Sequence, residues 1–279
     1  MTWTDLDRPP LSAIRLQRDL VEDGFDLRVV ARTASTNADL VAAAATGAAE
    51  GTVLVAESQE AGRGRLGRTW TSPPRAGLTV SVLLRPVAAD GWLPLLTGFA
   101  LALALRDHAG LDATVKWPND VVVAGPDGVE RKLAGILAEV AADGAVVIGV
   151  GVNVTTRADE FAGVVPGSSE PTSLALAGAR VTDRETVLKT FLRSLSRAYA
   201  SWRSDPASIA PLYRQVSATL GRQVRIELPD GTGVTGTARD VDAAGRLVVE
   251  AGDGTRTAYA AGDVVHLQVA ARDAGEGLP

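Results

Sequence analysis

The sequence predicts an α+β protein with a central mixed, largely antiparallel sheet flanked by helices, followed by a small β-barrel. Three observations predict this class. Strand patterns before residue 220 follow one another as adjacent hairpins, which pair antiparallel. Helical patterns with strong apolar periodicity lie before and after those strands. After residue 221, short strands alternate with glycine turns for about fifty residues without a helical period.

Turn and cap signals divide the first 220 residues into separate elements. Ser35 is expected to cap a short alanine-rich helix that stops before Gly47. Thr182 and Glu185 have the spacing of a capping box at the start of a later helix. In chain order we expect a helix over 11–21, the capped helix over 40–45, strands over 53–56 and 78–84, a helix over 93–109, strands near 115 and over 121–123, 133–140 and 146–154, a helix through 187–202, and a second helix ending near 220.

The amino-acid composition limits the kinds of catalytic and metal site that the protein can have. The chain has 279 residues, 46% hydrophobic and 22% charged, enough for one large domain or two unequal ones. A net charge of −5 argues against a protein that mainly coats nucleic acid. There is no cysteine, and the two histidines, His108 and His266, are far apart, which excludes thiol chemistry, disulfides and a histidine metal cage. Catalysis must therefore use lysine, arginine, carboxylate, hydroxyl or backbone groups.

Membrane and targeting signals are missing from the sequence. Its apolar stretches stay far below the roughly 18 residues needed to cross a bilayer, and the first residues do not form a signal peptide. We therefore expect a soluble, cytoplasmic protein with no membrane partner. Residues 1–34 are mixed in charge and hold one helical pattern, too little for a winged helix-turn-helix, so we expect no nucleic-acid partner.

An arginine-rich segment, 62–70, has the sequence GRGRLGRTW. It matches the dinucleotide fingerprint GxGxxG and comes within one residue of a P-loop, but both motifs need a following helix whose N-terminus binds phosphate. The prolines at 73 and 74 forbid that helix. The segment is either a solvated loop or a loop that orders over an anion. Its three glycines favour the second interpretation, because ordering them costs entropy.

Two further polar clusters interrupt apolar strands. The segment 116–120, KWPND, is either a turn with a side-chain hydrogen bond or the rim of a site. Lys132 is either an edge-strand gatekeeper or a site cation. In an ideal strand Lys132 and Gly135 would face opposite sides, so their joint use requires a strand start or a bulge at Lys132. The glycines of 149–153, GVGVN, serve either helix packing or ligand contact.

Taken in order, five segments resemble the biotin protein ligase family: 35–37, Gln59 with 62–67, 116–120, 132–137 and 149–153. The resemblance spans residues 35 to about 155 and continues through the C-terminal barrel. It implies a fold related to lipoate ligases and class II synthetases, with an SH3-like C-terminal domain. The implied organisation is a catalytic domain over 1–220, an SH3-like domain over 221–270 and a disordered tail over 271–279.

The resemblance also implies the reaction. Biotin and ATP give biotinyl-5′-AMP and pyrophosphate, and the biotinyl group then passes to one lysine of a biotin carboxyl carrier domain of acyl-CoA carboxylase or a similar biotin enzyme. Mg²⁺ is expected to accompany ATP, with ligands that the sequence does not identify. The protein is expected to be a monomer or a weak homodimer.

Site residues are carried over from the resemblance at matching positions. Trp70 is the expected wall for adenine, since an aromatic face beside a basic loop offers stacking. The catalytic group would be Arg65, Lys132 and Asp120. The ATP or adenylate site would contain Arg63, Arg65, Arg68, Trp70, Asn119 and Lys132. The biotin site would contain Ser35, Thr36, Asn37, Gln59, Arg63, Gly64, Arg65, Lys132, Gly135, Leu137 and Gly151.

The chemistry agrees with those roles. A carboxylate that attacks the α-phosphorus brings two anions together, so the first step needs fixed cations, which Lys132 and Arg65 would supply. A free lysine is almost entirely protonated near neutral pH, so the second step gains from a carboxylate that accepts its proton, and Asp120 is the candidate. A loop that closes over the adenylate would exclude water from a reactive anhydride.

Two alternatives remain at this point. A lipoate or octanoate ligase on the same scaffold predicts a narrow tunnel for a linear acyl chain. A non-catalytic biotin-binding module predicts biotin binding without AMP formation, although the presence of Arg63, Arg65 and Lys132 argues against it. Release of pyrophosphate that depends on the added acid distinguishes these functions.

Overall fold

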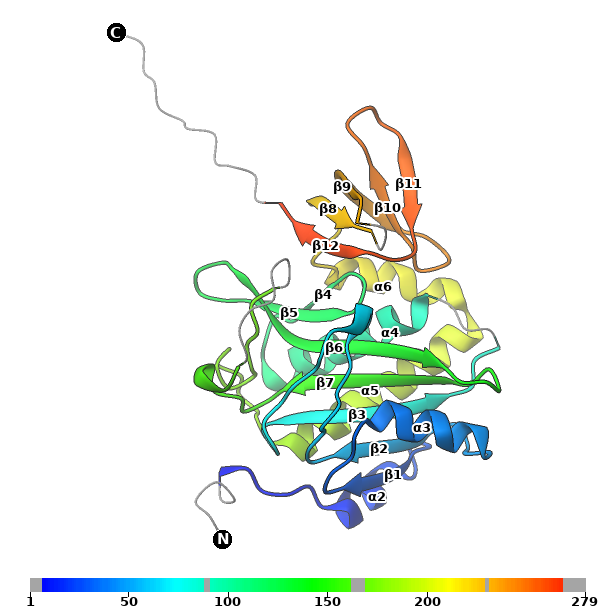
Figure 1. Ribbon diagram of the computed structural model, residues 1–279, viewed down its shortest axis with the longest axis vertical. Helices are drawn as coiled ribbons and strands as arrows, with labels where there is room; N and C mark the ends of the chain where they lie inside the picture. Colours follow the sequence, from blue (N-terminus) through cyan, green and yellow to red (C-terminus); the bar gives the residue numbers. More distant parts are fainter. Residues whose placement is uncertain (1–6, 88–90, 162–168, 229–230, 268–279) are drawn as a thin grey trace.

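The computed structural model describes residues 7–87, 91–161, 169–228 and 231–267, which form two sheets (Figure 1). The large sheet has seven strands in the spatial order β1-β2-β3-β7-β6-β5-β4. The expected α+β class with a mixed sheet is confirmed. The strands of the large sheet are β1 (Asp26–Val30), β2 (Thr52–Ala56), β3 (Gly77–Leu84), β4 (Thr114–Lys116), β5 (Asp120–Ala124), β6 (Glu130–Val140) and β7 (Val146–Asn153).

One edge of the large sheet was not predicted. Strand β1 pairs with β2 in parallel, whereas the other neighbouring pairs are antiparallel. The chain between β1 and β2 passes through a helix, as a parallel connection requires. As an edge strand, β1 fully buries only Leu27, so its apolar pattern is too short to stand out from the surrounding charged residues.

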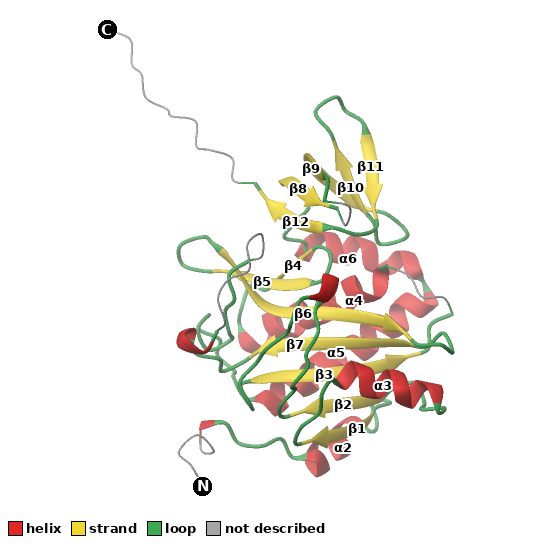
Figure 2. Ribbon diagram, viewed as in Figure 1, coloured by secondary structure: helices red, strands yellow, loops and turns green. Residues whose placement is uncertain are grey.

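Helices cover both faces of the large sheet. Figure 2 shows α4, α5 and α6 behind the sheet and α3 in front of it. Each face has its own group of buried apolar residues. Leu96 and Phe191 belong to the group on the side of α4 and α5, and Leu40 of α3 and Val147 of β7 belong to the group on the other side. The helices are α2 (Ala13–Leu20), α3 (Thr36–Ala45), α4 (Trp92–Ala104), α5 (Arg184–Ser204) and α6 (Ile209–Val216).

Two predicted helix starts can be compared with the structure. The Ser35 hydroxyl accepts a hydrogen bond from the backbone of Ala38 and caps α3, as expected. The expected capping box at Thr182 is wrong. Asp183 caps α5 instead, accepting from the Thr186 backbone at 2.8 Å. Glu185 is engaged elsewhere, where its carboxylate accepts from the Ser12 backbone at 2.7 Å.

The C-terminal sheet has five antiparallel strands in the order β11-β10-β9-β8-β12, which fits the expected SH3-like part. It rests on the first part of the chain through two indoles. Trp92 Nε1 donates to the Asp242 carbonyl at 3.0 Å, and Trp117 Nε1 donates to the Gly245 carbonyl at 3.1 Å. Its strands are β8 (Gln223–Glu227), β9 (Gly233–Val241), β10 (Leu247–Glu250), β11 (Arg256–Tyr259) and β12 (Asp263–His266).

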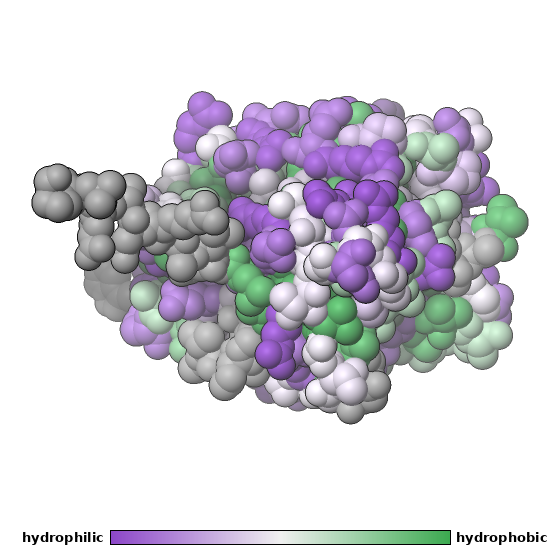
Figure 3. Space-filling model, turned by 90° about the horizontal axis from the view of Figure 1, so that it is seen from above, coloured by the Kyte–Doolittle hydropathy of each residue, from purple (hydrophilic) through white to green (hydrophobic). Residues whose placement is uncertain are grey.

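The end of the molecule seen in Figure 3 carries hydrophilic residues along one edge and hydrophobic residues in separate patches. Among the described residues, no helix combines the length and apolar character needed to cross a membrane. The expected tail over 271–279 lies outside the described residues.

Candidate active site

Five directly paired residues cross the large sheet in one row and form the floor of a cleft. From β3 to β4 they are Thr79, Gly151, Gly135, Asp120 and Lys116. All five line the cleft, which has a volume of about 460 Å³. Two glycines in the middle expose backbone without a side chain, while a carboxylate and an ammonium group stand at one end. This row gives the cleft an apolar middle and a charged end.

Trp70 lies over the two glycines. A Cβ atom on Gly151 would come within 2.3 Å of Trp70 Cε2, and one on Gly135 would come within 3.3 Å of Cζ3. The Lys132 ammonium is 5.9 Å from the centre of the Trp70 ring, at cation–π distance. The glycines are therefore needed for the close approach of an aromatic ring to the strands.

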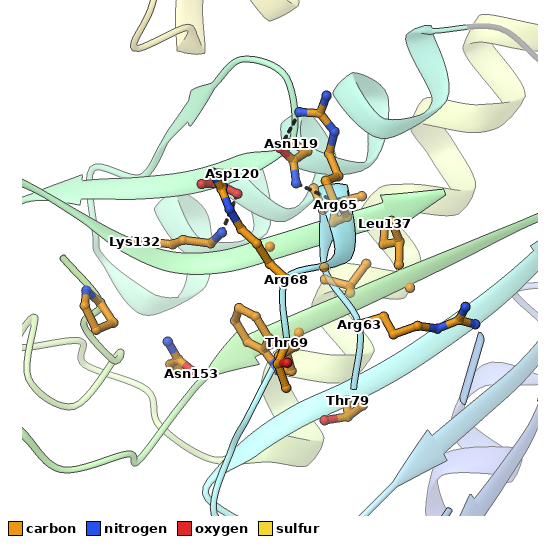
Figure 4. A pocket seen from close by; sticks show the side chains of 18 of the residues that line it. Arg63, Arg65, Arg68, Thr69, Thr79, Asn119, Asp120, Lys132, Leu137 and Asn153 are labelled. Atoms are coloured by element: carbon orange, nitrogen blue, oxygen red, sulfur yellow. Dashed lines mark hydrogen bonds and ion pairs between the residues drawn. The ribbon is translucent and has the colours of Figure 1, made fainter. Parts of the chain in front are cut away.

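Lys132 reaches the cleft because β6 contains a bulge. The register of β6 against β5 shifts by one residue at Leu133, so the expected bulge is confirmed. Lys132 and Gly135 consequently face the same side of the sheet. The Lys132 Nζ atom lies 2.7 Å from Asp120 Oδ1, and Figure 4 shows these two side chains pointing toward each other.

The segment 62–70 crosses the sheet on the face that carries α3 (Figure 1) and forms a lid over the cleft. No helix follows it, as the prolines predicted. Three backbone hydrogen bonds brace it, from Gly64 to the Arg68 carbonyl at 2.7 Å, from Arg68 to the Arg65 carbonyl at 3.1 Å and from Trp70 to the Gly62 carbonyl at 2.9 Å. The lid is therefore a compact turn held by its own backbone, and its arginine side chains contact residues outside the lid.

The three lid arginines have different partners. Arg65 Nη1 donates to Asn119 Oδ1 at 3.3 Å and to the carbonyl of Gly262 at 3.4 Å. Arg68 forms an ion pair with Asp263 at the start of β12. Arg63 lies apart in Figure 4 and pairs with Glu139 at 3.3 Å. Burial lowers the pKa of the Arg65 guanidinium, which nevertheless stays protonated near neutral pH.

The other end of the cleft is a neutral hydrogen-bonding pocket. Gln59 Oε1 accepts from the backbone of Thr36 at 2.9 Å. The hydroxyl of Ser81 lies 2.7 Å from Thr36 Oγ1 and 2.6 Å from Asn37 Oδ1. Asn37 in turn donates to the Leu137 carbonyl at 3.2 Å and to the Glu139 carboxylate at 2.7 Å. These side chains hold one another in place, so their remaining donors and acceptors are preorganised for a polar ring.

The structure brings all the sequence-predicted site residues to this one cleft. They are Ser35, Thr36, Asn37, Gln59, Arg63, Gly64, Arg65, Arg68, Trp70, Asn119, Asp120, Lys132, Gly135, Leu137 and Gly151. Sequence reasoning missed Thr79, Ser81 and Asp263. Thr79 and Ser81 alternate with apolar residues of β3, a weak signal for an inward polar face, whereas nothing local connects Asp263 to a site about two hundred residues earlier in the chain.

Within the described ranges, no group of three or more histidine and acidic residues is arranged to hold a metal ion. Asp120, the carboxylate on the floor of the cleft, is paired with Lys132.

Comparisons with known proteins agree with this geometry. The Biotin/lipoate A/B protein ligase family matches residues 29–153, and the Biotin protein ligase C terminal domain matches residues 219–267. A biotin–[acetyl-CoA-carboxylase] ligase from Mycobacterium tuberculosis is 43% identical over 279 residues, which cover 96% of this chain and 100% of the relative. A bifunctional ligase/repressor BirA from Bacillus spizizenii is 32% identical over 222 residues, covering 77% of this chain and 66% of that protein.

Among solved structures, the biotin protein ligase from Aquifex aeolicus in complex with biotin and ATP superposes with a TM-score of 0.71 at 25% sequence identity. The match covers 88% of this chain and 99% of the Aquifex chain. From its sequence, its fold and its cleft, this chain belongs to the biotin protein ligase family.

Proposed function

We propose that this protein activates biotin with ATP to form biotinyl-5′-AMP and transfers the biotinyl group to a lysine of a biotin carboxyl carrier protein. The observation that carries this proposal is the convergence of Arg65 and Lys132 on one cleft whose opposite end is a neutral hydrogen-bonding pocket. That arrangement suits a carboxylic acid with a polar ring, because the pocket can hold the ring at one end of the cleft while the carboxylate of the ligand lies beside the cations at the other end.

In the first step, a carboxylate oxygen of biotin attacks the α-phosphorus of ATP. A carbon–oxygen–phosphorus link forms, the bond between the α-phosphorus and the bridging oxygen breaks, and pyrophosphate leaves with the electron pair. Lys132 neutralises the carboxylate and the α-phosphate as they approach, and Arg65 adds a second cation from the lid. Asp120 holds the Lys132 ammonium in position at 2.7 Å.

In the second step, the neutral amine of the carrier lysine attacks the acyl carbon, an amide forms and AMP leaves. The amine must first lose a proton, and Asp120 is the carboxylate on the cleft floor that we propose to accept it. Arg65, Arg68 and the rest of the lid cover the adenylate and keep water from the anhydride until the carrier docks. Trp70 supplies the aromatic surface for adenine.

The polar pocket favours biotin over a linear acyl acid. Thr36, Asn37 and Gln59 present amide and hydroxyl groups that match the donors and acceptors of a ureido ring. A lipoyl or octanoyl chain has no ring donors or acceptors for the positions that these side chains leave unused, and a polar group left unsatisfied on burial costs about 1–3 kcal/mol. A lipoate or octanoate ligase is therefore the less favourable assignment, and the arginines and Lys132 argue against a module that only binds biotin.

Other aspects of this function are also our proposals. The catalytic part comprises residues 1–220 and the SH3-like part residues 221–270. Mg²⁺ would accompany ATP and, when bound, would supply charge neutralisation. The protein acts in the cytoplasm, where ATP and carrier proteins are available, as a monomer or weak homodimer, and nucleic acid is not a partner because the net charge is −5.

The direct test supplies the protein with ATP, Mg²⁺ and either biotin, lipoate or octanoate, and measures pyrophosphate release and acyl transfer to a biotin carboxyl carrier domain. We expect release and transfer with biotin alone. Release with lipoate or octanoate in preference to biotin would reassign the substrate. Tight biotin binding without AMP or pyrophosphate would show that the protein only binds biotin.

A further inference from the structure

We propose that Lys116 binds the β- and γ-phosphates of ATP and stabilises pyrophosphate as it leaves. This inference rests on the proposed function and assigns a residue to the part of the cleft beyond Asp120. Lys116 occupies the last position of β4 and lines the cleft, directly opposite Asp120 in the sheet register.

The buried Lys116 side chain has no carboxylate partner among the described residues. The residue is only 9% exposed, and its Nζ donates a hydrogen bond to the neutral hydroxyl of Ser169 at 3.0 Å. Over the part of the chain that the structure describes, no carboxylate lies within ion-pair distance of this ammonium. Burying an ammonium group in this way is unfavourable unless an anion joins it.

The three carboxylates whose charges act on Lys116 are already paired with other cations. Asp120 is 2.7 Å from Lys132, and Asp263 is paired with Arg68. Glu130 lies 2.7 Å from Arg222 and 2.8 Å from the His266 ring. The protein therefore satisfies each of these acids separately and leaves the positive charge of Lys116 available to a ligand.

The position of Lys116 suits the far end of a triphosphate. Lys132 on β6 and Lys116 on β4 are separated by β5, two strand spacings or roughly 10 Å across the sheet. Lys132 is beside Trp70 and the glycines of the floor, where the carboxylate and the α-phosphate would react. A polyphosphate that continues across Asp120 therefore reaches Lys116 with its terminal groups.

The negative charge that develops on the leaving pyrophosphate explains why a cation at the position of Lys116 would help the reaction. When the bond to the bridging oxygen breaks, its electron pair and negative charge pass to pyrophosphate, so a fixed cation at that end stabilises the transition state more than the bound substrate. Burial lowers the pKa of the Lys116 ammonium in the free protein. An incoming polyanion favours the protonated form and removes the repulsion between Lys116 and Lys132.

The test separates the two half-reactions in Lys116→Met, which keeps the side-chain length and removes the charge. We expect the rate of biotin-dependent pyrophosphate release to fall roughly 100-fold with an increased KM for ATP. Biotin affinity and transfer to the carrier from supplied biotinyl-5′-AMP should stay within about 2-fold of wild type. Lys116→Arg should restore part of the first half-reaction. Lys189→Met is the matched control, because Lys189 lies on α5 and pairs with Asp19 at 3.0 Å.

The outcomes are distinct. Unchanged pyrophosphate release in Lys116→Met, or an equal loss in both half-reactions together with a lower Tm, would overturn the assignment. A loss confined to transfer would also overturn it and would place Lys116 with the acceptor lysine. If wild type released no pyrophosphate with biotin, the proposed function itself would fail, a result that the variant cannot mimic.

Discussion

Lys132 and Gly135 face the same side of the large sheet because β6 carries one extra residue between them, Leu133. A Cβ atom on Gly135 would lie 3.3 Å from Lys132 Nζ and 3.3 Å from Trp70. The bulge therefore aims a cation over the glycine floor and toward Asp120. It converts an apolar strand into one that supplies both backbone surface and charge to the cleft.

Replacing Lys132 tests the charge that the bulge delivers. We expect Lys132→Met to lower the rate of pyrophosphate release about 100- to 1000-fold, because a preorganised cation is lost where the two anions meet. Biotin affinity should fall less, since the ring pocket is intact. Rates of release and calorimetric binding measure the two effects, and Lys189→Met again serves as control. Equal losses in binding and rate would mean that Lys132 only anchors biotin.

Gly151→Ala tests the contact between the sheet and Trp70. The new Cβ would lie 2.3 Å from the indole, so Trp70 must move, and we expect a loss of about 1–3 kcal/mol in the free energy of unfolding and a higher KM for ATP. Gly135→Ala, at 3.3 Å, should have a smaller effect. Gly252→Ala, where nothing lies within 4 Å, is the matched control. Identical denaturation midpoints and tryptophan fluorescence in all three variants would contradict this account.

Arg65 is expected to act mainly on the intermediate. Arg65→Gly removes the lid contacts with Asn119 and Gly262, and should accelerate dissociation of biotinyl-5′-AMP more than it weakens biotin itself. Dissociation rates of the adenylate and equilibrium binding of biotin measure the difference. Equal losses for both ligands would show that the arginine is a general scaffold and does not retain the adenylate.

Asp120 has two proposed roles, positioning Lys132 and accepting the proton of the acceptor lysine, and measurements at different pH values distinguish them. Asp120→Asn should slow pyrophosphate release, because Lys132 loses its 2.7 Å partner, and should also slow transfer from supplied adenylate. Raising the pH toward about 9 should restore transfer, since more of the acceptor lysine is then neutral without help. It should not restore pyrophosphate release. Transfer at the wild-type rate at neutral pH would exclude Asp120 as the base.

The contact between β6 and β12 should be sensitive to acid. Burial of Glu130 opposes its ionisation, but the His266 hydrogen bond and the charges of His266, Arg222 and Lys116 outweigh that effect and hold the pKa of Glu130 below its ordinary value of 4.5. A lowered pKa means that the ionised form stabilises the fold above pH 4.5 and that this contribution is lost as pH falls through the folded-state pKa.

Glu130→Gln should therefore lower the free energy of unfolding by about 1.5–3 kcal/mol at pH 7, with a smaller difference from wild type near pH 3. Chemical denaturation at both pH values gives the comparison, and the exposed Glu22→Gln substitution is the control. A difference that grows toward acid would have the wrong sign for this ion pair.

The order of polar and apolar residues along the chain was sufficient to predict most elements. Alternation in 78–84 and the β-branched residues of 146–154 predicted two central strands, the prolines at 73 and 74 excluded a helix after the lid, and Ser35 marked the start of α3. Local patterns misplaced the cap of α5, because Glu185 binds Ser12 from a distant part of the chain. They also missed β1, whose burial depends on its neighbours.

The sequence by itself determined which residues share a face of a strand and that a cation at 132 needs a bulge to join Gly135, because side-chain direction follows from backbone geometry over a few residues. Only the tertiary structure decided that Lys116 stands opposite Asp120, or that Asp263 from the C-terminal sheet meets Arg68. Strand register and the packing of the two sheets are set by contacts between distant segments, so the local spacing of apolar residues does not reveal them.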